Sequence, residues 1–185
     1  RLREKYKLHR KQLDPHEKDR LDELILNRIS GLYEFGRGTL LSYVSLSGEV
    51  DTTRAINLAL SSGMRVAVPL CVNKTTNLEF YYIDSLSQLR PGTFSVPEPD
   101  PRAHELVTDL GGGICLIPAL SIDRDGYRLG YGKGYYDRFL TNYQGLKVGL
   151  CYSDCLRYHL ERGKHDRPVD VIITERMIKR LNKRV

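Results

Sequence analysis

The sequence predicts an α/β fold, in which strands and helices alternate along the chain and a central sheet lies between layers of helices. Two observations support this prediction. Short apolar runs bounded by glycine or proline, which are typical of buried strands, alternate with stretches of helical periodicity. In two places a strand, a helix and a strand follow one another closely, and such units usually pair their strands in parallel through a right-handed crossover.

The chain begins with two predicted helices. Arg1–Leu13 is strongly basic, and we expect its cations to form a solvated face, with a binding face as the alternative. Asp14 then provides an N-cap, Pro15 occupies the first helical position, and Glu17 completes the capping pattern. The second helix should end near Gly31.

The first strand–helix–strand unit follows. Gly38–Leu46 contains enough apolar residues to form a buried strand. Asp51 or Thr52 caps the next helix, which should stop at Gly63. Val66–Val72 is the second strand, and we expect it to run parallel to the first.

The middle of the chain contains a strand and a proline-rich segment. Leu78–Ile83 reads as a strand that is reached through a hairpin-like turn at Asn73–Asn77. Four prolines then crowd Arg90–Arg102. Because proline lacks a backbone N–H group, we expect this segment to be an extended surface loop without regular structure.

The second half of the sequence predicts a second strand–helix–strand unit and three further elements. The unit consists of the strand Gly113–Pro118, a helix over residues 134–143 and the strand Lys147–Tyr152. The further elements are a short helix near Asp154–Leu160, the strand Val169–Thr174 and a basic terminal helix, Arg176–Lys183. Together the elements predict a three-layer, Rossmann-like single domain over residues 1–185. Its mostly parallel central sheet should hold a ligand at the carboxyl ends of the strands.

One glycine-rich stretch, Arg128–Leu140, is the strongest functional signal in the sequence. Glycines alternate with other residues at positions 130, 132 and 134, and the cations Arg128, Lys133 and Arg138 surround them. Such a loop at the start of a helix favours a bound anion, so the pattern indicates a phosphate or nucleotide site. The alternative is a simple connection between a strand and a helix, since the pattern matches neither the P-loop nor the dinucleotide fingerprint.

The charged residues near this loop indicate phosphoryl transfer. Arg128 and Lys133 can compensate the charge of a phosphate. Asp137 and Asp166 are candidate magnesium ligands, although each also reads as a helix cap or a surface ion pair. Since no Ser/His/Asp or Cys/His nucleophile set is visible, the expected chemistry is positioning and charge neutralisation without a covalent nucleophile.

Composition limits the remaining classes of function. The net charge of +6 and the isoelectric point near 9.1 suit an anionic ligand or partner. The sequence has no apolar run long enough to span a bilayer and no signal-peptide pattern, and its first residue is not methionine. The four cysteines form neither a disulfide framework nor a metal-binding pattern, which favours a reducing, cytoplasmic setting.

A longer motif that contains the glycine-rich stretch resembles a known family. It comprises Pro118, Asp123, Gly126 and the run from Arg128 to Arg138, and it is similar to the motif of the 5-formyltetrahydrofolate cyclo-ligases, also called 5,10-methenyltetrahydrofolate synthetases. The resemblance extends along nearly the whole chain through Leu2-Arg3, Glu49–Thr52, Glu98-Pro99, His165-Asp166 and Ile173–Glu175. A cysteine, Cys155, stands where the family often has glutamine.

The resemblance implies an enzyme that uses ATP and Mg²⁺ to convert 5-formyltetrahydrofolate to 5,10-methenyltetrahydrofolate, ADP and phosphate. In this reaction the formyl oxygen is phosphorylated and N10 then closes the ring. Arg128 and Lys133 would be catalytic. ATP would be held by Arg3, Arg128, Leu129, Gly130, Tyr131, Gly132, Lys133, Gly134, Tyr135 and Tyr136. The folate would contact Val44, Glu49 and Tyr136, and magnesium would bind Asp137 and Asp166.

Two other functions remain open from the sequence. The charge of +6 and the twelve tyrosines would also suit a basic nucleic-acid-binding domain, because bases stack on aromatic rings over a basic groove. A folate-binding protein without turnover is the other alternative. Our expectation is a monomer that acts on small molecules rather than on nucleic acid or membranes.

Overall fold

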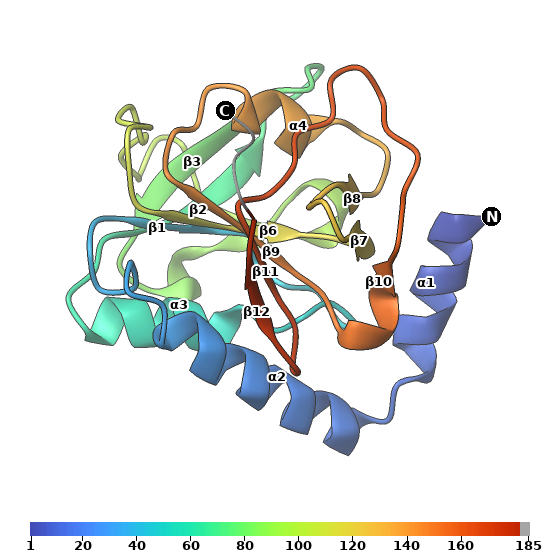
Figure 1. Cartoon of the computed structure of the whole chain (residues 1–185). Coiled ribbons are helices and arrows are strands. Elements are labelled where there is room, and N and C mark those ends of the chain that lie inside the picture. Colours follow the sequence, from blue (N-terminus) through green and yellow to red (C-terminus); the bar gives the residue numbers. More distant parts are fainter. Residues whose placement is uncertain (182–185) are drawn as a thin grey trace.

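Seven strands pair into one sheet in the computed structural model, which describes residues 1–181. These strands are β1 (Leu40–Ser42), β2 (Val66–Cys71), β3 (Leu78–Ile83), β6 (Ile114–Pro118), β9 (Leu146–Leu150), β11 (Val171–Ile173) and β12 (Ile178–Arg180). Their order across the sheet is β12-β11-β9-β6-β1-β2-β3 (Figure 1). The five inner strands pair in parallel, and β3 and β12 pair antiparallel at the two ends. The predicted mostly parallel sheet is confirmed.

Helices cover both faces of this sheet (Figure 1). They are α1 (Leu2–Gln12), α2 (Pro15–Ser30), α3 (Thr53–Ser61) and α4 (Tyr135–Leu140), with 3₁₀ turns at Leu86–Gln88, Thr93–Ser95 and Ser153–Cys155. Helices α2 and α3 pack on one face, and α1 and α4 contribute to the core of the other. This arrangement confirms the three-layer α/β fold. Of the helices within residues 1–181, none has the length and apolarity needed to cross a bilayer.

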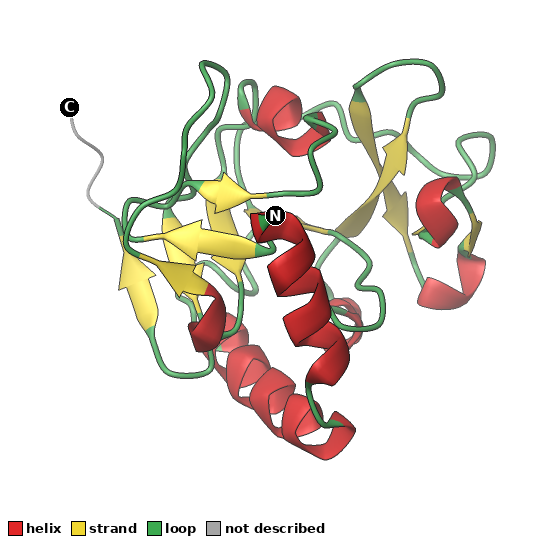
Figure 2. Cartoon of the chain, turned by 90° about the vertical axis from the view of Figure 1, so that its right-hand side faces the viewer, coloured by secondary structure: helices red, strands yellow, loops and turns green. Residues whose placement is uncertain are grey.

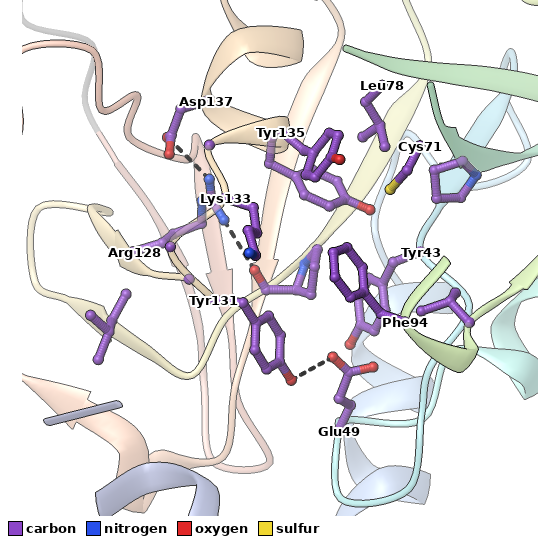
Figure 3. A pocket seen from close by; sticks show the side chains of 18 of the residues that line it. Tyr43, Glu49, Cys71, Leu78, Phe94, Arg128, Tyr131, Lys133, Tyr135 and Asp137 are labelled. Carbon is purple, nitrogen blue, oxygen red and sulfur yellow. Dashed lines mark hydrogen bonds and ion pairs between the residues drawn. The ribbon is translucent and has the colours of Figure 1, made fainter. Parts of the chain in front are cut away.

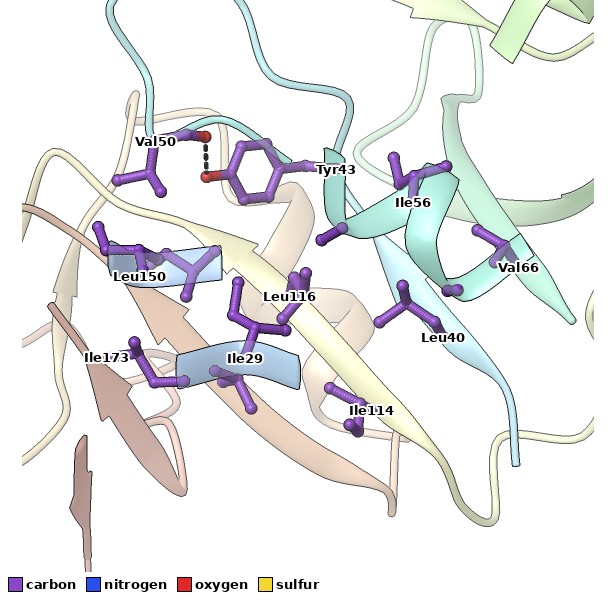
Figure 4. Close-up of a cluster of buried hydrophobic side chains, with 14 of the residues drawn as sticks. Ile29, Leu40, Tyr43, Val50, Ile56, Val66, Ile114, Leu116, Leu150 and Ile173 are labelled. Carbon is purple, nitrogen blue, oxygen red and sulfur yellow. Dashed lines mark hydrogen bonds between the residues drawn. The ribbon is translucent and has the colours of Figure 1, made fainter. Parts of the chain in front are cut away.

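The central strand β6 explains why both faces must be covered. Ile114 and Leu116 point into the core beneath α2 and α3, whereas Cys115 and Ile117 belong to the opposite core. All four side chains are fully buried. A strand that is apolar on both sides is stable only between two layers, as its uninterrupted apolar sequence predicts. Figure 4 shows Ile114 and Leu116 among the side chains of the first of these cores.

The local signals for α2 act as the sequence predicts. The Asp14 carboxylate accepts a hydrogen bond from the Glu17 backbone N–H at 3.0 Å, and Pro15 begins the helix. Gly31 ends it. Figure 2 shows that the N-terminal end of α1 lies beside the strands and that its other end meets α2. The first residues of α1 therefore lie beside the glycine-rich loop, where Arg3 contacts Gly130.

A small second sheet, which the sequence did not predict, lies between β6 and the glycine-rich loop. It has the order β10-β7-β8, from β7 (Ser121–Asp123), β8 (Arg128–Leu129) and β10 (Leu156–Arg157). The helix predicted near Asp154–Leu160 was wrong, because this segment contains only a 3₁₀ turn followed by β10. The buried Asp123 carboxylate accepts the N–H group of Leu160 at 3.1 Å, and this long-range bond holds the segment in place.

The proline-rich segment is also more regular than predicted. Strands β4 (Arg90–Pro91) and β5 (Pro97–Glu98) form an antiparallel pair, with a 3₁₀ turn between them. Pro91 lies opposite Pro97, and the ladder is continued by a bond from the Gly92 N–H to the Val96 carbonyl at 2.9 Å. Proline is tolerated in so short a pair because it fits extended backbone and needs only positions that donate no ladder bond.

Two further predicted helices differ from the structure. Helix α4 ends at Leu140 rather than at residue 143. The basic helix predicted at the C-terminus was wrong, since residues 178–180 form β12, antiparallel to β11, and residues 182–183 lie outside the described residues. The Thr174 hydroxyl accepts the N–H groups of Arg176 and Met177 at 3.1 and 3.2 Å. This turn reverses the chain and allows β12 to pair.

Truncation of the central strand should be costly. Leu116→Ala removes a fully buried side chain from the core beneath α2 and α3, so we expect the free energy of unfolding to fall by about 2–5 kcal/mol. Denaturant unfolding followed by circular dichroism measures this loss. Leu58→Ala on the exposed side of α3 is the matched control and should change stability by less than about 1 kcal/mol. Equal losses in the two variants would contradict this description of the core.

Candidate active site

A cavity of about 670 Å³ opens at the carboxyl ends of the parallel strands. Tyr43 and Val44 follow β1 and Pro118 ends β6, and these residues line the cavity together with the glycine-rich loop. All of the site residues predicted from the sequence line it as well: Arg3, Val44, Glu49, Arg128, Leu129, Gly130, Tyr131, Gly132, Lys133, Gly134, Tyr135, Tyr136, Asp137 and Asp166. The fold therefore brings these residues together, while their individual roles remain predictions.

Arg128 lies inside the wall of the cavity, with its side chain only 4% exposed. Its Nη1 donates to the carbonyl of Pro118 and its Nη2 to Oδ1 of Asp137, both at 3.1 Å (Figure 3). Its Nε is buried and bonds to no other residue within 1–181. A buried donor without a partner is unfavourable, and an anion at this position would satisfy it.

The glycine-rich loop is held against α1. Nε of Arg3 donates to the Gly130 carbonyl at 2.8 Å. Gly132 and Gly134 have φ values of +90° and +75°, a conformation that glycine adopts without strain. Lys133 extends from the loop into the cavity, where its Nζ lies 5.7 Å from the centroid of the Phe94 ring. The loop thus combines open backbone with positive charge, the arrangement that phosphate groups require.

The far side of the cavity is mostly apolar. Cys71 and Leu78 lie across from Arg128 and Asp137 in Figure 3. Burial raises the pKa of the Cys71 thiol to about 11, so this side chain is a neutral thiol near pH 7 and not a nucleophile. Tyr136 also lines the cavity, and burial raises the pKa of its hydroxyl well above the usual value, which keeps it neutral. A flat, largely apolar ring system fits this wall.

Glu49 is the carboxylate between the two sides, and it is only 7% exposed. Its Oε2 accepts the backbone N–H of Leu46 at 2.7 Å, and its Oε1 accepts the Tyr131 hydroxyl at 2.9 Å (Figure 3). Burial, followed by the Glu49 charge, raises the pKa of Tyr131 to about 12. The tyrosine is therefore a neutral donor to the carboxylate over the whole physiological pH range.

The sequence interpretation missed Arg10, whose helix was expected to present its cations to solvent. Arg10 is instead buried, and its Nη1 donates to the Tyr131 hydroxyl at 2.9 Å. Its Nη2 donates to the carbonyl of Ala119. A signal was available, because Arg10 lies four residues after Tyr6 and thus on the side of α1 that faces the core.

Asp137 and Asp166 fit a magnesium ion held mainly by phosphate oxygens and water. Oδ1 of Asp137 accepts from Arg128 and from the Arg167 N–H at 3.2 Å, and Oδ2 of Asp166 accepts the Gly163 N–H at 2.8 Å. Within the described part of the chain, no group of three or more His, Cys, Asp or Glu side chains could hold a metal ion. Two carboxylates that line one cavity with the glycine-rich loop match the preference of magnesium for few protein ligands.

Asp123 organises the loop that carries Arg128. It is fully buried, and its Oδ1 accepts the N–H groups of Asp125 and Tyr127, both at 3.0 Å. Its Oδ2 accepts from the Leu160 N–H at 3.1 Å and from Arg162 at 3.3 Å. One carboxylate thus fixes the β7–β8 turn and ties it to the segment after β10.

Asp123→Asn should loosen this loop. Both carboxylate oxygens of Asp123 accept hydrogen bonds, whereas asparagine has one accepting oxygen and one NH₂ group. In the variant the NH₂ group would face the N–H of Leu160, and the negative charge opposite Arg162 would be lost. We expect a loss of about 1–3 kcal/mol in the free energy of unfolding, measured by denaturant titration. Asp125→Asn, which removes a half-exposed charge paired with Arg162 and Arg124, is the control and should cost less than about 1 kcal/mol. Equal costs would show that Asp123 has no organising role.

Comparisons with known proteins agree with this geometry. Residues 1–175 match the model of the 5-formyltetrahydrofolate cyclo-ligase family. The chain is 30% identical over 159 residues to the 5-formyltetrahydrofolate cyclo-ligase of Mycolicibacterium smegmatis, which covers 82% of this chain and 80% of that protein. It is 27% identical to the enzyme of that name from Mus musculus, over 94% of this chain and 92% of the mouse protein.

Solved structures give the same result. The 5,10-methenyltetrahydrofolate synthetase of Aquifex aeolicus superimposes with a TM-score of 0.85 and 34% identity, covering 98% of this chain and 92% of that chain. The synthetase of Mycoplasma pneumoniae superimposes with a TM-score of 0.71 and 25% identity, covering 94% and 96%. The chain therefore belongs to the 5-formyltetrahydrofolate cyclo-ligase family, as its sequence resemblance predicts.

Proposed function

We propose that this protein uses ATP and Mg²⁺ to convert 5-formyltetrahydrofolate to 5,10-methenyltetrahydrofolate, with ADP and phosphate as the other products. Membership of the cyclo-ligase family supports the reaction. The observation that carries the assignment of the phosphate site is Arg128, a buried cation whose Nε donor is unpaired among the described residues, at the base of the glycine-rich loop. A nucleotide phosphate is the anion that this loop suits best.

The residues on the loop side would act by position and charge. The formyl oxygen attacks the γ-phosphorus, the bond to ADP breaks, and N10 then attacks the activated carbon as phosphate leaves. Arg128 and Lys133 would neutralise charge on the transferred group, and the N–H groups of the loop would orient it. Magnesium, held by Asp137 and Asp166, would supply further neutralisation of the phosphates. No protein nucleophile is needed.

The opposite side of the cavity would hold the folate. The apolar wall that includes Val44 suits the flat pterin ring, and Glu49 and Tyr136 offer polar contacts at its edge. A volume of about 670 Å³ lies within the usual range for small-molecule sites. Both substrates would therefore meet in one cavity, which a direct transfer between them requires.

The nucleic-acid alternative loses its main support. Several of the tyrosines that suggested a stacking surface are buried, namely Tyr6, Tyr43, Tyr81, Tyr143 and Tyr152. A buried ring cannot stack on a base. The remaining alternative, a folate-binding protein without turnover, is separated from the enzyme by the assay below. A monomeric state and a cytoplasmic setting stay predictions.

The reaction is tested by the absorbance of the methenyl product. We expect it to grow only when 5-formyltetrahydrofolate, ATP and magnesium are all present. Arg128→Ala should lower kcat by about 10²–10³, because it removes a donor to the transferred phosphate. Arg138→Ala changes an arginine of helix α4, which follows the glycine-rich loop, and this residue does not line the cavity. It is the matched control and should retain activity within about twofold.

Either of two results would refute this assignment. A flat trace from the wild-type protein, with folate binding still detectable by calorimetry, would favour a binding protein without turnover. Activity of Arg128→Ala equal to that of Arg138→Ala would remove Arg128 from the reaction. Circular dichroism of the Arg128 variant should accompany the assay, because the side chain is buried.

Removal of magnesium gives an independent prediction. Chelation with EDTA should abolish turnover, and added Mg²⁺ should restore it. In Asp137→Asn and Asp166→Asn the Mg²⁺ concentration for half-maximal activity should rise about 10-fold or more, since a carboxylate ligand becomes a weaker neutral one. Asp170→Asn, outside the cavity, should leave the Mg²⁺ requirement unchanged. The same requirement in all three variants would exclude these carboxylates as ligands.

A further inference from the structure

Three side chains from distant segments form a continuous chain of hydrogen bonds beside the cavity. Arg10 comes from α1, Tyr131 from the glycine-rich loop and Glu49 from the turn after β1. Arg10 donates to the Tyr131 hydroxyl, and that hydroxyl donates to Glu49, each at 2.9 Å. The direction is fixed, because a guanidinium group can only donate, so the tyrosine must direct its own hydrogen to the carboxylate.

Both charged groups of this hydrogen-bond chain, Arg10 and Glu49, are buried. Arg10 is 9% exposed and Glu49 is 7% exposed. A buried charge is costly unless it is paired and hydrogen-bonded. Nε of Arg10 bonds to no residue within 1–181, and its Nη2 reaches only a neutral carbonyl, that of Ala119. The hydroxyl of Tyr131 is therefore the group through which the buried cation and the buried anion are joined.

The two ends of this hydrogen-bond chain lie on segments that pack against each other, whereas its middle lies on the glycine-rich loop. At one end, the turn that carries Glu49 packs directly on α1, since a Cβ added to Gly48 would lie 3.4 Å from Cβ of Arg10. In the middle, Tyr131 has a glycine on either side, and glycine leaves the backbone free to adopt many conformations. The Tyr131 hydroxyl and the bond from Arg3 to Gly130 tie this part of the loop to the turn after β1 and to α1.

We propose that the Arg10–Tyr131–Glu49 chain couples the two halves of the cavity, so that the binding of nucleotide and the binding of folate strengthen each other. This inference rests on the proposed function, in which the loop holds ATP and Glu49 contacts the folate. A nucleotide that orders the loop fixes the Tyr131 hydroxyl, and with it the orientation of the Glu49 carboxylate. By linkage, folate bound at Glu49 raises the affinity for nucleotide by the same factor.

Arg10 and Tyr131 are positioning residues in this proposal. They act through Glu49 and through the loop rather than on the reacting atoms. The quantity that reports their role is therefore the ratio of folate affinities with and without nucleotide. A merely structural side chain would change both affinities, or the stability, and leave that ratio unchanged.

Isothermal titration calorimetry tests the coupling. 5-Formyltetrahydrofolate is titrated into the full chain, first alone and then in the presence of magnesium and a non-hydrolysable ATP analogue. We expect the analogue to increase the folate affinity of the wild-type protein by about 5-fold or more. In Tyr131→Phe, which loses only the hydroxyl, the ratio should fall to within about twofold of one. Tyr158→Phe, at a tyrosine that is 72% exposed, is the matched control and should keep the wild-type ratio.

Variants of Arg10 provide a second measurement. Arg10→Lys keeps the charge but replaces the two separate donor nitrogens of the guanidinium with one ammonium nitrogen, so we expect a coupling ratio between those of the wild type and Tyr131→Phe. Lys11→Met removes an exposed cation from the same helix and should leave the ratio unchanged. Thermal unfolding of each variant confirms that the ratio is measured on folded protein.

The outcomes separate the two proposals. If both ligands bind the wild-type protein but their affinities are independent, or if Tyr131→Phe keeps the wild-type ratio, the coupling is refuted while the proposed function stands. If the wild-type protein binds neither ligand, both are refuted.

Discussion

Parallel pairing on both sides of β6 is the constraint on which the site depends. β6 bonds in parallel to β1 and β9, so the carboxyl ends of the three strands meet at one edge of the sheet. Segments that leave these ends share one space, in accordance with the general rule for open α/β sheets. The residues that follow β1 and β6 therefore face the glycine-rich loop. A buried core on each face of β6 holds these strand ends in place.

Two buried guanidinium groups organise the end of β6. Arg128 donates to the carbonyl of Pro118 and Arg10 to the next carbonyl, that of Ala119. From this common point Arg128 reaches Asp137, whereas Arg10 reaches Tyr131 and, through it, Glu49. Each arginine thus connects the end of the sheet to a different carboxylate of the cavity. Arg128 also lines the cavity, so one of these permanent cations lies in its wall.

Local signals predicted the elements that depend on neighbouring residues, and they failed where contacts between distant segments decide the structure. The N-cap of α2 at Asp14, the buried strand before Pro118 and the glycine loop all depend on neighbours in the chain, and the structure contains each of them. Strands β7, β8 and β10 have only two or three residues each, and their positions follow from the bonds of Asp123 to distant segments. Strand β12 exists because β11 is available for pairing. No periodicity within a segment encodes such contacts.

Some of the basic residues of the chain lie on β12, far along the sequence from the glycine-rich loop. This strand ends the order of the sheet, and its residues Ile178, Lys179 and Arg180 are exposed. An open strand edge is a template for pairing with another chain, and charged side chains along it are a common protection against such association. Lys179 and Arg180 place charged side chains of this kind on the last strand of the sheet. Part of the positive charge that first suggested an anionic partner therefore lies on an edge strand and not at the cavity.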